Sequence, residues 1–188
     1  MKNKKTLLIL FTLVGLVQLF VPLQMIFNQE DIINNGIAFK FKTEPVDPSD
    51  PFRGKYITLS FKEEEIIVKN IKNWHNGETI FAKIGTDKNG FAKIISISKT
   101  KPNGNSNYLK LKIGYVSTIE NENKIFLNFP FERFYMNENK ASNAEVTYAE
   151  SMTDEKNKTY ALVAVKNGEA VIKDVLINDI SVKDLVTK

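Results

Sequence analysis

The chain has 188 residues and no cysteine, which excludes disulfide bonds, cysteine-ligated zinc and thiol catalysis. Its formal net charge is +4, but Lys2, Lys4 and Lys5 supply three of the 26 basic residues, and the others nearly balance the 22 acidic ones. Because no basic stripe remains, the composition argues against nucleic acid as a partner. Apolar residues make up 43% of the chain, enough to fill the core of one domain.

The first predicted element is an apolar helix over residues 6–27, TLLILFTLVGLVQLFVPLQMIF, which contains no charged residue. As a helix it is about 33 Å long, enough to cross a hydrocarbon core of about 30 Å. Lysines precede it, and Glu30 and Asp31 follow it. The positive-inside rule therefore predicts a single-pass protein of the cell membrane, with a cytoplasmic N-terminus and an extracytoplasmic domain.

Two alternatives to this anchor remain. A cleaved signal peptide has a shorter apolar core followed by a cleavage site with small residues, and no such site follows this segment. The segment can also be a buried helix of a soluble protein. The anchor interpretation predicts a boundary near residue 28, with residues 29–188 forming the domain.

The domain is predicted to be mainly antiparallel β with short helices, an α+β class. Residues 37–43 and 56–61 alternate apolar and polar side chains, as half-buried strands do. Residues 63–74 place apolar side chains at helical spacing behind three glutamates, which predicts a helix. The later elements are expected to be hairpins over 79–98 and 159–177, a loop over 99–107, strands over 108–118 and 124–129, and a weak helix over 141–156.

Parts of the chain repeat at a spacing near 80 residues. The two predicted hairpins turn at Gly90 and Gly168, and their sequences KNGFAKIISI and KNGEAVIKDV match around the turn. PFRGKY (51–56) likewise resembles PFERFY (130–135). The repeat predicts two duplicated halves, 29–100 and 106–188, although any two hairpins can share a turn sequence.

A proline-rich stretch, PVDPSDPFRGKYITLSF, begins at Pro45. Its prolines recur every three residues, the period of polyproline II, so Asp47, Asp50 and Arg53 are expected along one edge, roughly 9 Å apart. Gly54 then permits a turn before the strand. Such an edge can bind a ligand, a cation or a partner protein. The acidic groups can equally bond nearby backbone amides and lock the entry to the strand.

This stretch resembles the signature PVDPxDPxRGDYxxLxY of the GDYXXLXY protein family, which follows an N-terminal membrane segment. Lys55 stands where the family has Asp, and Phe61 replaces its final Tyr. Phe61 keeps the aromatic ring and loses only the hydroxyl, which suits a packing role. The matching residues are Pro45, Val46, Asp47, Pro48, Asp50, Pro51, Arg53, Gly54, Tyr56 and Leu59.

The stretch 132–145 resembles the family's second block, an Arg–aromatic strand followed by two glutamates. Arg133 and Tyr135 occupy the strand, and Glu138 and Glu145 follow. The resemblance implies a membrane-anchored protein of the bacterial envelope, and a multi-pass membrane protein as its partner. It carries no established biochemical activity.

No motif selects catalytic residues. His75 is the single histidine, and nothing in its spacing supplies a nucleophile or an orienting acid. The sequence therefore predicts a binding or accessory subunit for a membrane partner, without cofactor or metal. An envelope hydrolase using acidic residues and a structural surface domain are the alternatives. The candidate binding residues are Asp47, Asp50, Arg53, Gly54, Tyr56, Arg133, Tyr135, Glu138 and Glu145.

Overall fold

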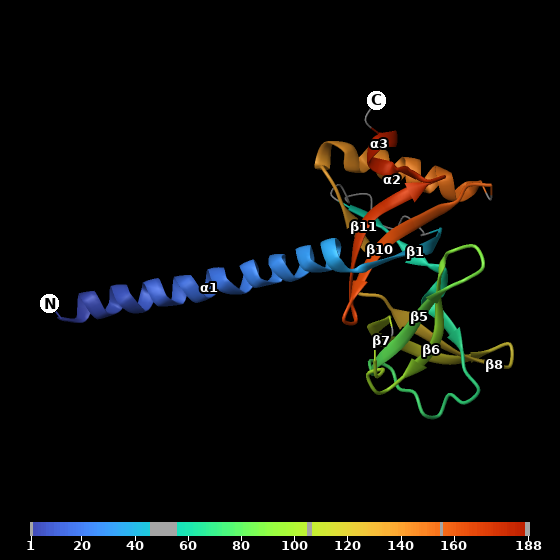
Figure 1. Ribbon diagram of the computed structural model, residues 1–188, viewed down its shortest axis with the longest axis horizontal. Coiled ribbons are helices and arrows are strands. Elements are labelled where there is room, and N and C mark those ends of the chain that lie inside the picture. Colours follow the sequence, from blue (N-terminus) through green and yellow to red (C-terminus); the bar gives the residue numbers. More distant parts are fainter. Residues whose placement is uncertain (1, 46–55, 105–106, 155, 187–188) are drawn as a thin grey trace.

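The computed structural model describes residues 2–45, 56–104, 107–154 and 156–186. A long N-terminal helix is followed by antiparallel sheets (Figure 1), so the predicted β-rich class is confirmed. The elements are α1 (Lys2–Asn35), β1 (Ile37–Glu44), β2 (Tyr56–Thr58), β3 (Ser60–Phe61), the 3₁₀ helix η1 (Lys62–Glu64), β4 (Glu65–Ile67), β5 (Thr79–Thr86), β6 (Ala92–Ser98), β7 (Tyr108–Ile119), β8 (Glu122–Asn128), β9 (Arg133–Tyr135), α2 (Glu138–Thr153), β10 (Thr159–Lys166), β11 (Glu169–Ile177), β12 (Ile180–Ser181) and α3 (Val182–Leu185).

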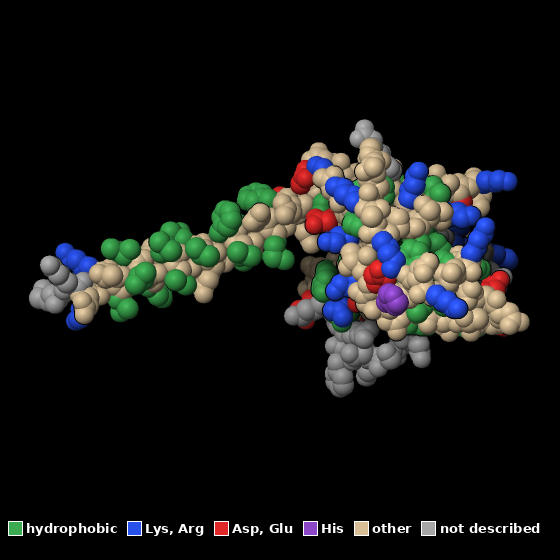
Figure 2. Space-filling view, turned by 90° about the horizontal axis from the view of Figure 1, so that it is seen from below, with side chains coloured by type: hydrophobic (Ala, Val, Ile, Leu, Met, Phe, Trp, Pro, Cys, Tyr) green, Lys and Arg blue, Asp and Glu red, His purple; other side chains and the backbone are tan. Residues whose placement is uncertain are grey.

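Helix α1 projects from the domain and is long and apolar enough to span a membrane. Its most apolar part is not buried against the described domain, and hydrophobic side chains cover its surface (Figure 2). The helix continues through Pro22 and ends at Asn35, where its last turns contact β10 and β11. Ile32 is buried there, and the Asp31 carboxylate lies 2.7 Å from the Lys166 ammonium. The apolar helix thus enters the domain without an intervening loop.

The strands form two five-stranded sheets and one two-stranded ribbon. The first sheet has the order β12-β11-β10-β1-β3, and the second has the order β4-β8-β7-β5-β6. Strands β2 and β9 pair with each other. Single bridges, Lys40 to Phe91 and Leu109 to Gly168, join the two sheets. One continuous core of buried side chains therefore extends through both sheets.

The predicted helix over residues 63–74 is wrong. Only Lys62–Glu64 form a 3₁₀ turn, and Glu65–Ile67 form β4, which pairs with β8. Ile66 and Ile67 are β-branched and favour a pleated strand. Ile66 lies opposite the fully buried Ile125, so pairing with the existing sheet outweighs the weak helical pattern.

The two long hairpins are irregular at equivalent positions. In β5–β6 the pairing skips Ile95, and in β10–β11 it skips Lys173. These two residues are 78 positions apart, as are Gly90 and Gly168 in the turns. Each predicted half contributes strands to both sheets, because β1 pairs with β10 and β7 pairs with β5. The duplication stays a prediction, and the equal spacing of the bulges favours it.

Candidate functional site

Strands β2 and β9 bring the first and second motif blocks together. They run antiparallel, with Tyr56 opposite Tyr135 and Thr58 opposite Arg133. The central residues of the two strands, Ile57 and Phe134, are buried. Because side chains alternate along a strand, the other four point to the opposite face. We call these four residues, Tyr56, Thr58, Arg133 and Tyr135, the ribbon face.

The ribbon face is a compact aromatic and cationic surface. The Tyr56 and Tyr135 rings are tilted with centroids 5.3 Å apart, and the Arg133 guanidinium lies 5.0 Å from the Tyr56 centroid. Such a cation–π contact holds the guanidinium against the ring. Tyr135 is 64% exposed, and the Arg133 side chain is 49% exposed. The neighbouring Tyr135 phenol raises the pKa of Arg133 further, so the guanidinium stays charged at every physiological pH.

The other first-block candidates, Asp47, Asp50, Arg53 and Gly54, lie outside the described residues. They directly precede Tyr56 along the chain, so the first block enters the ribbon at its Tyr56 end. The proposed edge of carboxylates and guanidinium stays a prediction.

The two candidate glutamates lie on α2. Glu138 is in its first turn, just after the N-cap Asn137, and Glu145 lies seven residues later, about two helical turns away. Ala141 and Tyr148 are also seven residues apart, so they share one side of the helix with each other, and both are buried. Burial raises the pKa of Tyr148 to about 12, so its phenol stays neutral. Helix α2 also contacts β2, so both glutamates belong to an element beside the ribbon.

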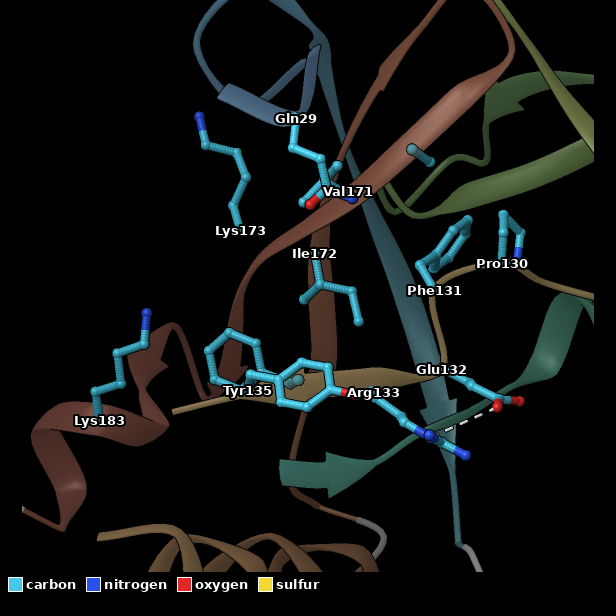
Figure 3. Close-up of a pocket in the computed structure, with 12 residues that line it drawn as sticks. Gln29, Pro130, Phe131, Glu132, Arg133, Tyr135, Val171, Ile172, Lys173 and Lys183 are labelled. Carbon is cyan, nitrogen blue, oxygen red and sulfur yellow. Dashed lines mark ion pairs between the residues drawn. The ribbon is translucent and has the colours of Figure 1, made fainter. Parts of the chain in front are cut away.

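A pocket of about 580 Å³ adjoins the ribbon (Figure 3). It is lined by residues 130–135, by residues 170–173 of β11, by Gln29 of α1 and by Lys183 of α3. The Lys183 ammonium lies 4.8 Å from the Phe134 ring centroid and 3.8 Å from an Asp174 carboxylate oxygen. The sequence analysis did not single out Lys173 or Lys183, because Lys173 was noted only as part of the hairpin repeat and Lys183 lies outside both motif blocks.

The family model for GDYXXLXY proteins matches residues 18–175. The chain belongs to the GDYXXLXY family. The match begins inside α1 and ends in β11, so it covers the ribbon and most of both sheets. The comparison with curated proteins gives no match, and neither does the comparison with solved structures.

The last two apolar positions of the GDYXXLXY motif belong to the core. Leu59 is 2% exposed and Phe61 is 1% exposed, so the predicted packing role of Phe61 is confirmed. Phe61 packs edge-on or tilted against three other rings, with centroids 5.4 to 5.8 Å apart: Phe41, Phe129 and Phe131. The Leu59 amide donates to the Glu132 carbonyl at 2.8 Å. The motif thus fixes its own strand against the second block.

Glu64 is an acidic group that the sequence analysis did not single out. Its carboxylate accepts from the Phe61 amide at 2.9 Å and lies 3.3 Å from the Ser60 hydroxyl. Burial, with smaller contributions from Glu44 and Glu132, raises the pKa of Glu64. Glu64 is not among the residues lining the pocket. The hydrolase alternative needs two such acids facing one pocket, and no observation on the described residues favours it.

Within the described ranges, no group of three or more His, Asp or Glu residues is placed to hold a metal ion. The ribbon face offers two phenol rings, one permanent cation and a threonine hydroxyl on a short surface. Tyrosine and arginine are the residue types enriched where protein interfaces gain most of their binding energy.

Proposed function

We propose that this GDYXXLXY protein is a membrane-anchored binding subunit of the bacterial envelope, and that its ribbon face contacts a multi-pass membrane partner. Helix α1 crosses the membrane with its N-terminal lysines in the cytoplasm, and the β-rich domain lies outside. The uncovered apolar surface of α1 supports the anchor, and the lysines before it and acids after it support the orientation.

The observation that carries this proposal is the pairing of β2 with β9. Two sequence blocks about 80 residues apart form one surface. Tyr135 and Arg133 lie on its exposed side. The ion pair between Arg133 and Glu132 is long, 3.8 Å, and half exposed, so it contributes little to folding. Arg133 and Tyr135 are thus available to a partner at small cost to the domain.

Co-purification from mild detergent tests the proposal. The tagged full-length protein should retain a multi-pass membrane protein, and Tyr135→Ala should weaken that association at least tenfold. An exposed aromatic anchor at an interface typically contributes about 2 kcal/mol or more, which is more than a factor of ten. The retained amount is measured by quantitative mass spectrometry of the eluate.

Tyr115→Ala is the matched control, because Tyr115 is also an exposed tyrosine, 49% exposed, stacked on Phe126 of the second sheet. This variant should keep the partner. Equal retention by wild type and Tyr135→Ala, with both folded, would refute the ribbon face as the contact. Arg53→Ala should behave like Tyr135→Ala if the first block shares the interface.

A further inference from the structure

The pocket beside the ribbon lies at a defined height above the apolar part of α1. It touches α1 at Gln29, two residues after Phe27, the last residue of the uncharged segment. At 1.5 Å per residue this is about 3 Å along the helix axis. The interfacial layer on each side of a bilayer is about 5 to 7 Å thick. With residues 6–27 in the hydrocarbon core, the edge of the pocket therefore lies within the headgroup layer.

The junction between helix and domain keeps the pocket at this height. Ile32 is 6% exposed, and Asp31 pairs with Lys166 at 2.7 Å. The Gly36 amide donates to the Ile32 carbonyl at 2.8 Å, so β1 follows directly from the helix. No flexible linker separates the anchor from the first sheet, and the domain cannot drift away from the membrane surface.

The walls of the pocket combine positive charge with apolar surface. Lys173 and Lys183 stand along one side, and the Arg133 guanidinium lies on the other, beside Glu132 (Figure 3). Among the described lining residues Glu132 is the one acidic group, against three cationic ones. Gln29, Tyr135 and six apolar residues complete the lining, the apolar ones being Pro130, Phe131, Phe134, Ala170, Val171 and Ile172. An amphipathic anion fits such a lining.

We infer that this pocket binds the phosphate-bearing headgroup of an anionic phospholipid from the adjacent leaflet. Lys173 and Lys183 contact the phosphate, and the apolar wall around Ile172 contacts the glycerol and the upper acyl chain. Lys173 is exposed on β11, and Lys183 of α3 lies on the same side of the pocket. This inference rests on the proposed membrane anchor but not on the proposed protein partner.

A second pocket lies further from the apolar part of α1, and this distance separates it from the lipid headgroups. It has about 370 Å³, contains Lys101 and Lys166, and touches α1 at Asn35. Asn35 is eight residues past Phe27, about 12 Å along the axis, which is beyond the headgroup layer. Lys166 there is already paired with Asp31. Of these two pockets, lipid binding is therefore assigned to the one at Gln29.

Cysteine protection tests the inference, because the chain has no cysteine of its own. The full-length Ile172→Cys variant is placed in lipid nanodiscs of phosphatidylcholine alone or with phosphatidylglycerol, and its reaction rate with an uncharged maleimide is measured. At about 1 kcal/mol per lysine at an anionic surface, two lysines predict that phosphatidylglycerol slows the reaction roughly thirtyfold. Adding Lys173→Ala should reduce this slowing about fivefold, and high salt should weaken it.

Four controls make the result specific. Lys93→Ala, an exposed lysine on β6, should leave the protection intact, and so should Lys173→Arg. Ile95→Cys, the bulge residue of the other hairpin, should react equally in both lipids. Inorganic phosphate added to phosphatidylcholine discs should not protect, since a free anion lacks the apolar part.

The possible failures are distinguishable. Equal rates for Ile172→Cys in both lipids, or unchanged protection in Lys173→Ala, would overturn the lipid site. Protection by inorganic phosphate alone would overturn the lipid as ligand and indicate a soluble anion. A chain that does not float with the discs would overturn the membrane anchor itself, which the proposed function also requires.

Discussion

Four phenylalanine rings hold the signature strand in place. Phe41, Phe61, Phe129 and Phe131 all contact one another, with centroids between 5.0 and 5.8 Å apart. They come from β1, from β3 and from the segment before β9, so one cluster joins the first motif block to the second. Edge-on aromatic pairs add about 0.5 to 1.5 kcal/mol beyond their burial.

Removing one ring from this cluster should therefore be costly. Phe61→Ala is expected to lower the free energy of unfolding by about 3 to 5 kcal/mol, since a large buried side chain leaves a cavity. Denaturant unfolding of the detergent-solubilised protein, followed by circular dichroism, measures the change. Val146→Ala on the exposed side of α2 should change stability by less than about 0.5 kcal/mol. A similar small loss for Phe61→Ala would contradict the cluster's role.

Glu64 lowers the stability of the fold at neutral pH, because its charged carboxylate is partly buried. Burial raises its pKa above the ordinary value of 4.5, so the folded state favours the neutral acid. The resulting penalty on stability is fully present above the raised pKa, and it disappears below about 4.5, where both states are protonated.

Glu64→Gln should remove this penalty while keeping both hydrogen bonds, to the Phe61 amide and the Ser60 hydroxyl. The melting temperature should rise by a few degrees at pH 7.5, and the gain should vanish below pH 4.5. Thermal scans of both proteins across this pH range measure the difference. A gain that is equal at both ends of the range would show that charge is not its cause.

The sequence predicted strands correctly where apolar and polar side chains alternate, as in β1, and where a Lys-Asn-Gly turn joins two strands, as at Gly90 and Gly168. The prediction for the segment after Glu64 was wrong because its isoleucines fit a helical spacing as well as a strand. What decided between the two was β8, whose Ile125 lies opposite Ile66. That partner is almost 60 residues away, and no local pattern contains it.

The joint between α1 and β1 depends on one glycine. A Cβ added at Gly36 would collide with the Ile32 carbonyl and come within 3.2 Å of the Val165 backbone. Gly36→Ala should therefore destabilise the junction by about 1 to 3 kcal/mol, as overpacking does. Limited proteolysis should then cleave faster between anchor and domain.

Gly15→Ala provides the comparison, because a Cβ at Gly15 has nothing within 4 Å. This variant should show the wild-type cleavage rate. Equal rates for both alanine variants would mean that the helix and domain are not held together at this point.

The pairing of strands that lie far apart in the chain could not be predicted from the sequence. β1 pairs with β10, more than 110 residues later, and β2 pairs with β9. Both motif blocks can be recognised in the sequence, but their contact, which creates the ribbon face, could not be predicted from it. The cationic pocket could not be predicted either, because Lys173 and Lys183 lie far along the chain from the two motif blocks.

Equivalent residues of the internal repeat occupy corresponding positions in the fold. Tyr56 and Tyr135 are equivalent positions of PFRGKY and PFERFY, and they lie directly opposite each other in the ribbon. The bulges at Ile95 and Lys173 are also equivalent. The duplication stays a prediction, and these coincidences favour it over shared turn chemistry alone.

One labelling measurement tests the central claim, that an anchored chain presents the ribbon face outside the cytoplasm. Tyr135→Cys introduces the only thiol, and intact cells or spheroplasts are treated with a membrane-impermeant maleimide. Labelling is expected before lysis, on a full-length protein that stays in the membrane fraction. Labelling only after lysis, or a labelled protein in the soluble fraction, would contradict it.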